Sequence, residues 1–201
     1  MYSLQRQCGR LLCGIALYLG FGALAWADET LWQALRSGEA VGLLRHALAP
    51  GGGDPAHFNV ADCATQRNLS AAGRQQAQAI GAAFRGKGIT TVRVLSSRWC
   101  RCLDTARLLG LGPVEPFPPL DSFFSYPERA DPQMAALREW LSRPYAGPPR
   151  VLVTHQVNIT ALTNIAPRSG ELIVVQPLMT GQVRVLGRLE PGENFLPIFS
   201  D

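Results

Sequence analysis

Short apolar runs alternate along this chain with segments whose apolar residues recur every three or four positions. The continuous runs cover residues 41–45, 92–95 and 151–154, and glycine, proline or polar residues flank each of them. Runs of this length and setting predict buried β-strands. Two later runs, at 172–175 and 182–187, predict a pair of strands that closes the sheet.

Helical spacing fills the stretches between these strands. The segment 71–85 is the clearest, because Ser70 is a suitable N-cap, the apolar residues share one side and glycines follow the end. Similar spacing predicts shorter helices at 30–38, 99–109, 133–141 and 158–164. The resulting order of strands and helices predicts an α/β fold with three layers, α/β/α, around a mostly parallel sheet.

The beginning of the chain follows a third pattern. Arg6 and Arg10 precede an apolar stretch over 11–25, and an Ala-Trp-Ala sequence then lies directly before two acidic residues. This arrangement predicts a cleaved secretory signal peptide over 1–27, with an uncleaved membrane anchor as the alternative. We therefore expect a secreted or periplasmic protein with one domain over 28–201 and no membrane span after cleavage.

The composition is that of a folded protein with little excess charge. Of the 201 residues, 47% are hydrophobic and 17% are charged, which excludes a disordered chain. The chain has 19 basic and 15 acidic residues, and loss of Arg6 and Arg10 with the signal leaves 17 basic residues and a net charge of +2. So small an excess argues against nucleic acid as a partner.

Two of the three histidines directly follow predicted core strands. His46 comes after Arg45 at the end of the first strand, and His155 ends the 151–154 run. Because ligands bind at the carboxyl ends of the strands in open α/β sheets, we expect both imidazoles at one crevice. Such a pair indicates a nucleophile and proton-transfer chemistry.

Arginines add the character of a phosphate site. Arg45 lies beside His46, and Ser96-Ser97 at the end of the second strand lead to Arg101. One arginine can donate two parallel hydrogen bonds to phosphate oxygens, and it can hold the equatorial oxygens of a transferring phosphoryl group. The sequence thus predicts a site for a dianionic phosphoryl group. No carboxylate cluster of the kind that holds Mg²⁺ accompanies the histidines, so we expect neither a metal nor another cofactor.

Cysteines remain in two places after cleavage of the signal. Cys63 lies in a long irregular segment at 47–68, and Cys100 and Cys102 begin the helix after the second strand. Both places follow the carboxyl ends of strands, so a disulfide between them would pin a loop that is long enough to be functional. We favour Cys63–Cys102, which would also fix the helix of Arg101, over Cys63–Cys100. Three free thiols are the alternative, and a zinc site is the weaker one.

Four ordered motifs resemble those of the histidine phosphatase superfamily, also called phosphoglycerate mutase-like. The family has R-H-G where residues 45–47 read R-H-A, and it has L-S-x-x-G-x-x-Q-A where residues 69–77 match in full. Its S-S-x-x-x-R-x-x-x-T-A is matched over 96–106, and its second H-G corresponds to H-Q at 155–156. The resemblance covers nearly the whole chain after residue 27 and implies the phosphoglycerate mutase-like fold.

The resemblance implies a role for each matched residue. His46 would accept the phosphoryl group as the nucleophile. Arg45, Arg101 and His155 would complete the phosphate pocket, and Arg98 would bind substrate at the rim.

The resemblance leaves two candidates for the proton donor. The family uses an acid beyond the pocket arginine, and both Asp121 and Glu128 lie there. We favour Asp121 because it directly follows the predicted edge of the core, and we place Glu128 among the substrate-binding residues. Ala47 and Gln156 replace family glycines, and we expect both to adopt ordinary backbone angles.

These expectations combine into a secreted or periplasmic phosphomonoesterase with a phosphohistidine intermediate. Its substrate would be a small-molecule or glycan phosphomonoester, such as a phosphosugar. The signal peptide, the long loop and the small size resemble the branch that contains lipopolysaccharide core heptose phosphate phosphatases. The alternative is a non-catalytic module that binds phosphate or a phosphosugar in the same pocket, which the loss of the usual acid motif favours.

Overall fold

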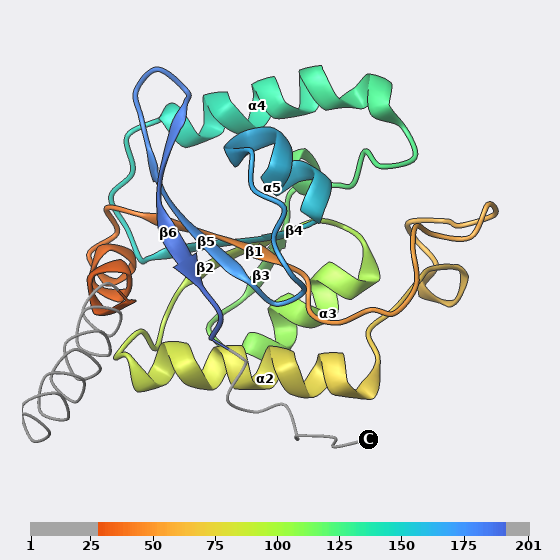
Figure 1. Cartoon of the computed structure of the whole chain (residues 1–201), viewed down its shortest axis with the longest axis horizontal. Helices are drawn as coiled ribbons and strands as arrows, with labels where there is room; N and C mark the ends of the chain where they lie inside the picture. The colour runs from red at the N-terminus through yellow and green to blue at the C-terminus, as the bar shows by residue number, and fades with distance from the viewer. Residues whose placement is uncertain (1–27, 192–201) are drawn as a thin grey trace, which may run out of the picture.

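One mixed six-stranded sheet forms the centre of the molecule (Figure 1). The structure is a computed structural model that describes residues 28–191, so the predicted signal peptide lies outside the described residues. The strands are β1 (Val41–Arg45), β2 (Arg93–Ser96), β3 (Val114–Pro116), β4 (Arg150–Thr154), β5 (Leu172–Pro177) and β6 (Val183–Leu189). Their order in the sheet is β3-β2-β4-β1-β5-β6.

Helices cover both faces of this sheet. They are α2 (Ala71–Gly86), α3 (Cys100–Leu109), α4 (Ala130–Ser142) and α5 (Gln156–Thr163), and residues 28–36 are also helical. Short 3₁₀ turns are η1 (Cys63–Thr65), η2 (Pro118–Leu120) and η3 (Pro127–Arg129). In Figure 1, α2 and α3 lie on one side of the sheet and α4 and α5 on the other.

Side-chain alternation along the strands divides the core into two layers. On β1, Leu44 packs with Phe84 of α2 and Leu109 of α3, whereas the adjacent Leu43 packs with Leu137 of α4. Successive side chains of a strand point to opposite faces, so a fully buried strand needs apolar residues at every position. This explains the continuous apolar runs and confirms the predicted three-layer α/β/α fold.

The sheet is parallel where the predicted site lies. β1 pairs in parallel with β4, and β4 with β2, so the carboxyl ends of these three strands lie side by side. β2 also pairs in parallel with β3, a strand that no apolar run in the sequence predicts. The expected closing pair is β5 and β6: β5 is antiparallel to β1, and β6 is antiparallel to β5 and so runs in the direction of β1.

Two glycines of α2 allow unusually close packing. A Cβ at Gly73 would lie 2.0 Å from the carbonyl oxygen of Leu48, and one at Gly81 would lie 1.9 Å from that of Leu109. The first contact presses α2 against the chain just after β1, and the second presses it against α3. Within residues 28–191, no helix combines the length and apolar character needed to cross a bilayer.

Candidate active site

His46 follows the last residue of β1 and is buried at 2% exposure. Its backbone N–H donates to Thr154 O at 3.0 Å, and its Nδ1 lies 2.8 Å from Ala47 O. A carbonyl oxygen can only accept, so Nδ1 carries the proton and Nε2 keeps a free electron pair. Burial, together with the positive charges of Arg101 and Arg45, lowers the pKa of His46 to about 3. The imidazole is therefore neutral at ordinary pH, as a nitrogen nucleophile must be.

His155 follows β4 and lies next to His46, with 5.6 Å between the ring centroids. Its Nδ1 is 3.4 Å from an Nη2 of Arg101, which can only donate, so the proton of His155 lies on Nε2. This Nε2 donates to Ser97 Oγ at 2.8 Å, and Ser97 in turn donates to Asp121 at 3.3 Å. Burial and the charge of Arg101 also hold the pKa of His155 well below its usual value.

Three arginines share a cavity of about 310 Å³ with the two histidines. Arg45 extends from β1, Arg101 from α3 and Arg67 from the loop between β1 and α2. Within the described part of the chain, the buried Nε atoms of Arg45 and Arg101 have no hydrogen-bond acceptor. Three guanidinium groups gathered around one cavity, two of them with an unpaired buried Nε–H, indicate an oxyanion as the natural occupant.

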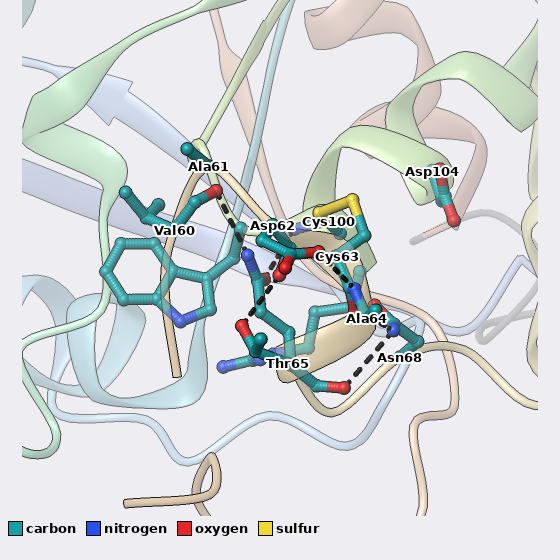
Figure 2. The surroundings of a disulfide bond; sticks show 12 residues. Val60, Ala61, Asp62, Cys63, Ala64, Thr65, Asn68, Cys100 and Asp104 are labelled. Carbon is teal, nitrogen blue, oxygen red and sulfur yellow. Dashed lines mark hydrogen bonds between the residues drawn. A yellow bond between two sulfur atoms is a disulfide. The ribbon is translucent and has the colours of Figure 1, made fainter. Parts of the chain in front are cut away.

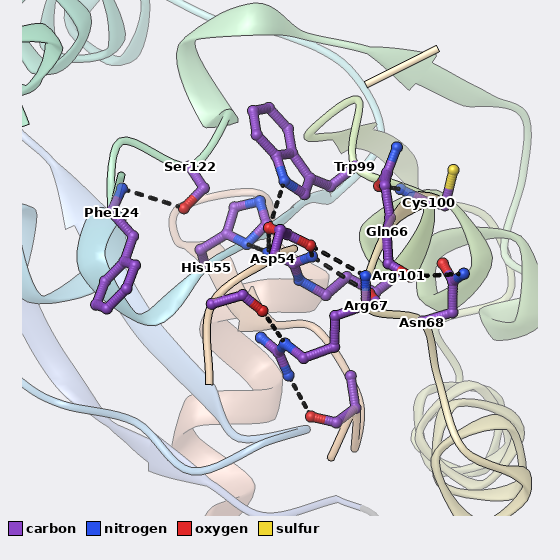
Figure 3. Close-up of polar contacts among 12 residues, drawn as sticks. Asp54, Gln66, Arg67, Asn68, Trp99, Cys100, Arg101, Ser122, Phe124 and His155 are labelled. Atoms are coloured by element: carbon purple, nitrogen blue, oxygen red, sulfur yellow. Dashed lines mark hydrogen bonds and ion pairs between the residues drawn. The ribbon is translucent and has the colours of Figure 1, made fainter. Parts of the chain in front are cut away.

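An aspartate that sequence reasoning missed completes the cavity wall. Asp54 lies in the long loop, and both of its oxygens contact Arg101, at 2.7 and 3.1 Å (Figure 3). The two side chains are 7% and 3% exposed, respectively. The only signal in the sequence was an acid directly after three glycines in a long loop, which does not by itself predict an arginine partner.

The expected acids lie elsewhere. Asp121 lines a neighbouring cleft and pairs with Arg98, whose Nε donates to it at 2.7 Å. Glu128 lies in η3 with 68% of its side chain exposed, and it lines neither of the two cavities described here. Asp121 thus reaches the histidines only through Ser97, and the half-exposed Arg98 lies in the outer cleft, outside the histidine cavity.

The neighbouring cleft has a volume of about 780 Å³ and meets the histidine cavity at Ser122, which lines both. Aromatic rings form much of its wall. The ring centroids of Phe58 and Trp99 lie 5.5 Å apart, and the guanidinium of Arg129 lies over the ring of Tyr126. Rings and arginines around an open cleft are suited to a polar ring with its own acidic substituent.

A disulfide ties the long loop to α3 (Figure 2). It joins Cys63 to Cys100, so the expected Cys63–Cys102 pairing is wrong. Residues two apart on a helix point in nearly opposite directions, and only Cys100 faces the loop. Cys102 is buried against Thr154 O and the ring of His155, and burial raises the pKa of its thiol to about 12.

Residues of the motifs at 69–77 and 96–106 bind the backbone that follows His46. Gln76 of α2 accepts from the backbone N–H of Leu48 at 3.0 Å, and Thr105 of α3 accepts from that of Ala47 at 3.0 Å. These bonds fix the chain just after His46. As expected, Ala47 and Gln156 have ordinary backbone angles, since Asn164 is the one non-glycine residue with positive φ among the described residues.

The comparisons with known proteins decide the family. The model of the histidine phosphatase superfamily (branch 1) matches residues 42–121, a segment that includes His46 and Arg101. The matched part of the chain, residues 42–121, belongs to the histidine phosphatase superfamily. The protein is accordingly a histidine-dependent phosphatase. His155 lies beyond the matched segment, and β4 brings it to the site. A search of curated proteins found no match.

Solved structures of histidine phosphatases share the fold. The protein histidine phosphatase SixA, complexed with tungstate, matches with a TM-score of 0.52 and 17% identity over 76% of this chain and 97% of that one. A candidate SixA from Agrobacterium tumefaciens matches with a TM-score of 0.50 and 21% identity over 77% and 99%. A candidate alpha-ribazole-5'-P phosphatase from Escherichia coli str. K-12 matches with a TM-score of 0.51 and 17% identity over 73% and 93%. At these identities the likeness concerns the fold.

Proposed function

We propose that this histidine phosphatase is an exported enzyme that hydrolyses a phosphosugar through a phosphohistidine on His46. The observation that carries the proposal is the neutral, buried His46 with a free Nε2 in a cavity whose arginines hold unpaired N–H groups. Nε2 attacks phosphorus and forms an N–P bond while the ester P–O bond breaks, and the leaving oxygen takes up a proton from solvent water. Water then cleaves the N–P bond, which releases phosphate and regenerates the imidazole.

The charge of the cavity matches a phosphate dianion. Arg45, Arg67 and Arg101 contribute three positive charges and Asp54 one negative charge, and both histidines are neutral, so the net charge is +2. In a buried site, arginines that are already oriented stabilise the charge of the transferring group without reorganising. His155 lines the same cavity and contacts Arg101 through Nδ1 at 3.4 Å.

The neighbouring cleft supports a sugar or a similar ring as the alcohol part of the substrate. It is larger than the histidine cavity, it meets that cavity at Ser122, and it offers the rings of Trp99 and Tyr126. Sugar rings present C–H faces that pack on aromatic rings and hydroxyl groups that bind arginine or aspartate. Arg98 and Arg129 at its edge would accept a further acidic group on the substrate.

Two features support export to the periplasm or beyond. One is the signal-like segment over 1–27, with its basic start, apolar stretch and Ala-Trp-Ala end. The other is the Cys63–Cys100 disulfide, because disulfides persist in oxidising compartments.

One observation favours the second candidate, a non-catalytic phosphosugar-binding module. The carboxylate in the histidine cavity, Asp54, and the one in the cleft, Asp121, are each ion-paired with an arginine. A site for an ester with a poor leaving group benefits from an acid that can release a proton to the leaving oxygen. A binding module needs no such acid.

Hydrolysis of a panel of phosphomonoesters by the mature protein separates these candidates. The panel contains sugar phosphates, a simple alkyl phosphate and an aryl phosphate, and His46→Ala serves as the inactive variant. His57→Ala is the matched control, because His57 is exposed in the loop and lines neither cavity described here.

We expect kcat/KM to be highest for a sugar phosphate, to be unaffected in His57→Ala and to be lost in His46→Ala. Binding of sugar phosphate without turnover by the wild-type protein would favour the binding module. Equal turnover of sugar and simple alkyl phosphates would contradict the phosphosugar assignment.

A further inference from the structure

The carboxylate of Asp54 accepts four hydrogen bonds. Oδ1 accepts from Arg101 Nη1 at 2.7 Å and from the backbone N–H of Arg67 at 3.1 Å. Oδ2 accepts from Arg101 Nη2 at 3.1 Å and from Trp99 Nε1 at 3.0 Å. Figure 3 shows this carboxylate between the indole and the guanidinium. Each oxygen thus has one donor from Arg101 and one donor from elsewhere.

The donors outside Arg101 fix Asp54 independently of the arginine. One is a backbone N–H and the other is the ring of Trp99, which is 5% exposed. The loop around Asp54 is also held, because Arg67 Nε donates to Gly53 O at 2.9 Å and its Nη1 to Ala49 O. A carboxylate held on one side can fix the plane of a guanidinium that it binds in a bidentate manner on the other.

Arg101 depends on this contact for its orientation. Its remaining Nη contacts are longer, at 3.3 Å to Arg67 O and 3.4 Å to His155 Nδ1, and its buried Nε has no acceptor among the described residues. Building on the proposed function, we propose that Asp54 is a positioning residue that holds Arg101 in the orientation required by the transferring phosphoryl group.

The same contacts argue against Asp54 as the proton donor to the leaving group. Burial raises the pKa of Asp54, but the bonds from Arg101, Arg67 and Trp99 outweigh burial and lower it. Hydrogen bonds to the ionised form keep a carboxyl group ionised. An ionised carboxylate has no proton to give, so its effect reaches the reaction through the guanidinium.

Asp54→Asn tests this role, because the amide has nearly the same shape but cannot accept both arginine N–H groups. We expect kcat to fall about 100-fold, as for a misplaced catalytic group. KM should stay within about threefold, because removal of the negative charge favours phosphate binding and offsets the lost orientation. Asp62→Asn is the matched control: Asp62 lies in the same loop, caps η1 and does not line the cavity, and an amide can also cap.

The leaving group distinguishes positioning from proton donation. Asp54→Asn should lower kcat/KM, which reports the step that expels the alcohol, by the same factor for phenyl phosphate and for p-nitrophenyl phosphate, since Arg101 acts on the phosphoryl oxygens. A loss that is much larger for phenyl phosphate, whose leaving group is the stronger base, would make Asp54 the acid and overturn the proposal. Undiminished kcat in Asp54→Asn, or an equal loss in Asp62→Asn, would also overturn it.

Trp99→Phe provides a second test if Asp54→Asn unfolds. It keeps a ring in place but removes one of the two donors that hold Asp54 from outside. We expect a smaller loss of kcat/KM that is again equal for both aryl phosphates, and unchanged kcat/KM would overturn the proposal. An inactive wild-type protein would mark the failure of the proposed function, whereas an active wild type with an equally active Asp54→Asn variant would mark the failure of this inference alone.

Discussion

At the scale of single residues, the chemistry depends on two histidines that stay neutral. Both are buried, and the nearby arginine charges act in the same direction as burial, so a proton on either ring is unfavourable. A neutral ring keeps a free electron pair for attack, and His46 directs it from Nε2 because Nδ1 is bound to Ala47 O. The arginines that give the cavity its positive charge thus also keep the ring of His46 neutral and able to attack.

This neutrality predicts how stability depends on pH. The pKa of His46 falls from 6.5 to about 3 on folding, so below pH 6.5 the unfolded chain binds a proton that the folded chain excludes. The free energy of unfolding should therefore fall as the pH drops from 6.5 towards 3, by up to about 1.4 kcal/mol for each pH unit and each such histidine. Urea unfolding of the phosphate-free protein at several pH values measures this slope.

His46→Gln and His57→Gln separate the buried ring from an exposed one. Loss of His46 should make the slope shallower, and loss of the exposed His57 should leave it unchanged. The same slope in His46→Gln as in the wild type would contradict the assignment of a depressed pKa to His46.

At the scale of elements, strand ends supply the histidines and the loop 47–70 closes the cavity. The loop contributes Asp54 and Arg67, yet the part around Cys63 contains few buried apolar residues. The Cys63–Cys100 disulfide and the cap of α2, where Gly73 N donates to Ser70 Oγ at 3.0 Å, hold it in place. The loop is therefore fixed by a covalent bond and polar contacts more than by a core of its own.

Removal of the disulfide should weaken the fold. Cys63→Ser with Cys100→Ser is expected to lower the free energy of unfolding by about 2–4 kcal/mol, because the bridge closes a loop in the unfolded chain. Urea unfolding measures the change, and peptide mapping without reduction identifies the pairing. Cys102→Ala is the control that retains the bridge. Recovery of a peptide that joins Cys63 to Cys102 would contradict the structure.

Elements with a strong apolar pattern could be predicted from the sequence, and those shaped by partners could not. The strands at 41–45 and 151–154 and the helix α2 have the expected position, because burial on one or both faces dictates their residues. The strand β3 is half-buried at most and lies in a Gly/Pro-rich stretch, so nothing in its own residues predicts pairing with β2. The cysteine pairing depended on which side of α3 faces the loop.

At the scale of the whole molecule, the order of the strands assembles the site. β4 lies between β1 and β2, so His155 lies between His46 and the Ser97–Arg101 segment although the three are far apart in sequence. The parallel arrangement of these strands follows from the alternating pattern, which is why histidines and arginines could be expected at one crevice. Asp54 could not be expected there, because the path of a loop is set by its tertiary contacts.

Trapping of a phosphoenzyme tests the central claim most directly. Rapid quenching during turnover of a ³²P-labelled substrate should give a protein-bound phosphate that is labile in acid and stable in base, and peptide mapping should place it on His46. The label should be absent from His46→Ala and retained in His57→Ala. Equal labelling of His46→Ala, or turnover by the wild-type protein without any labelled intermediate, would contradict the account.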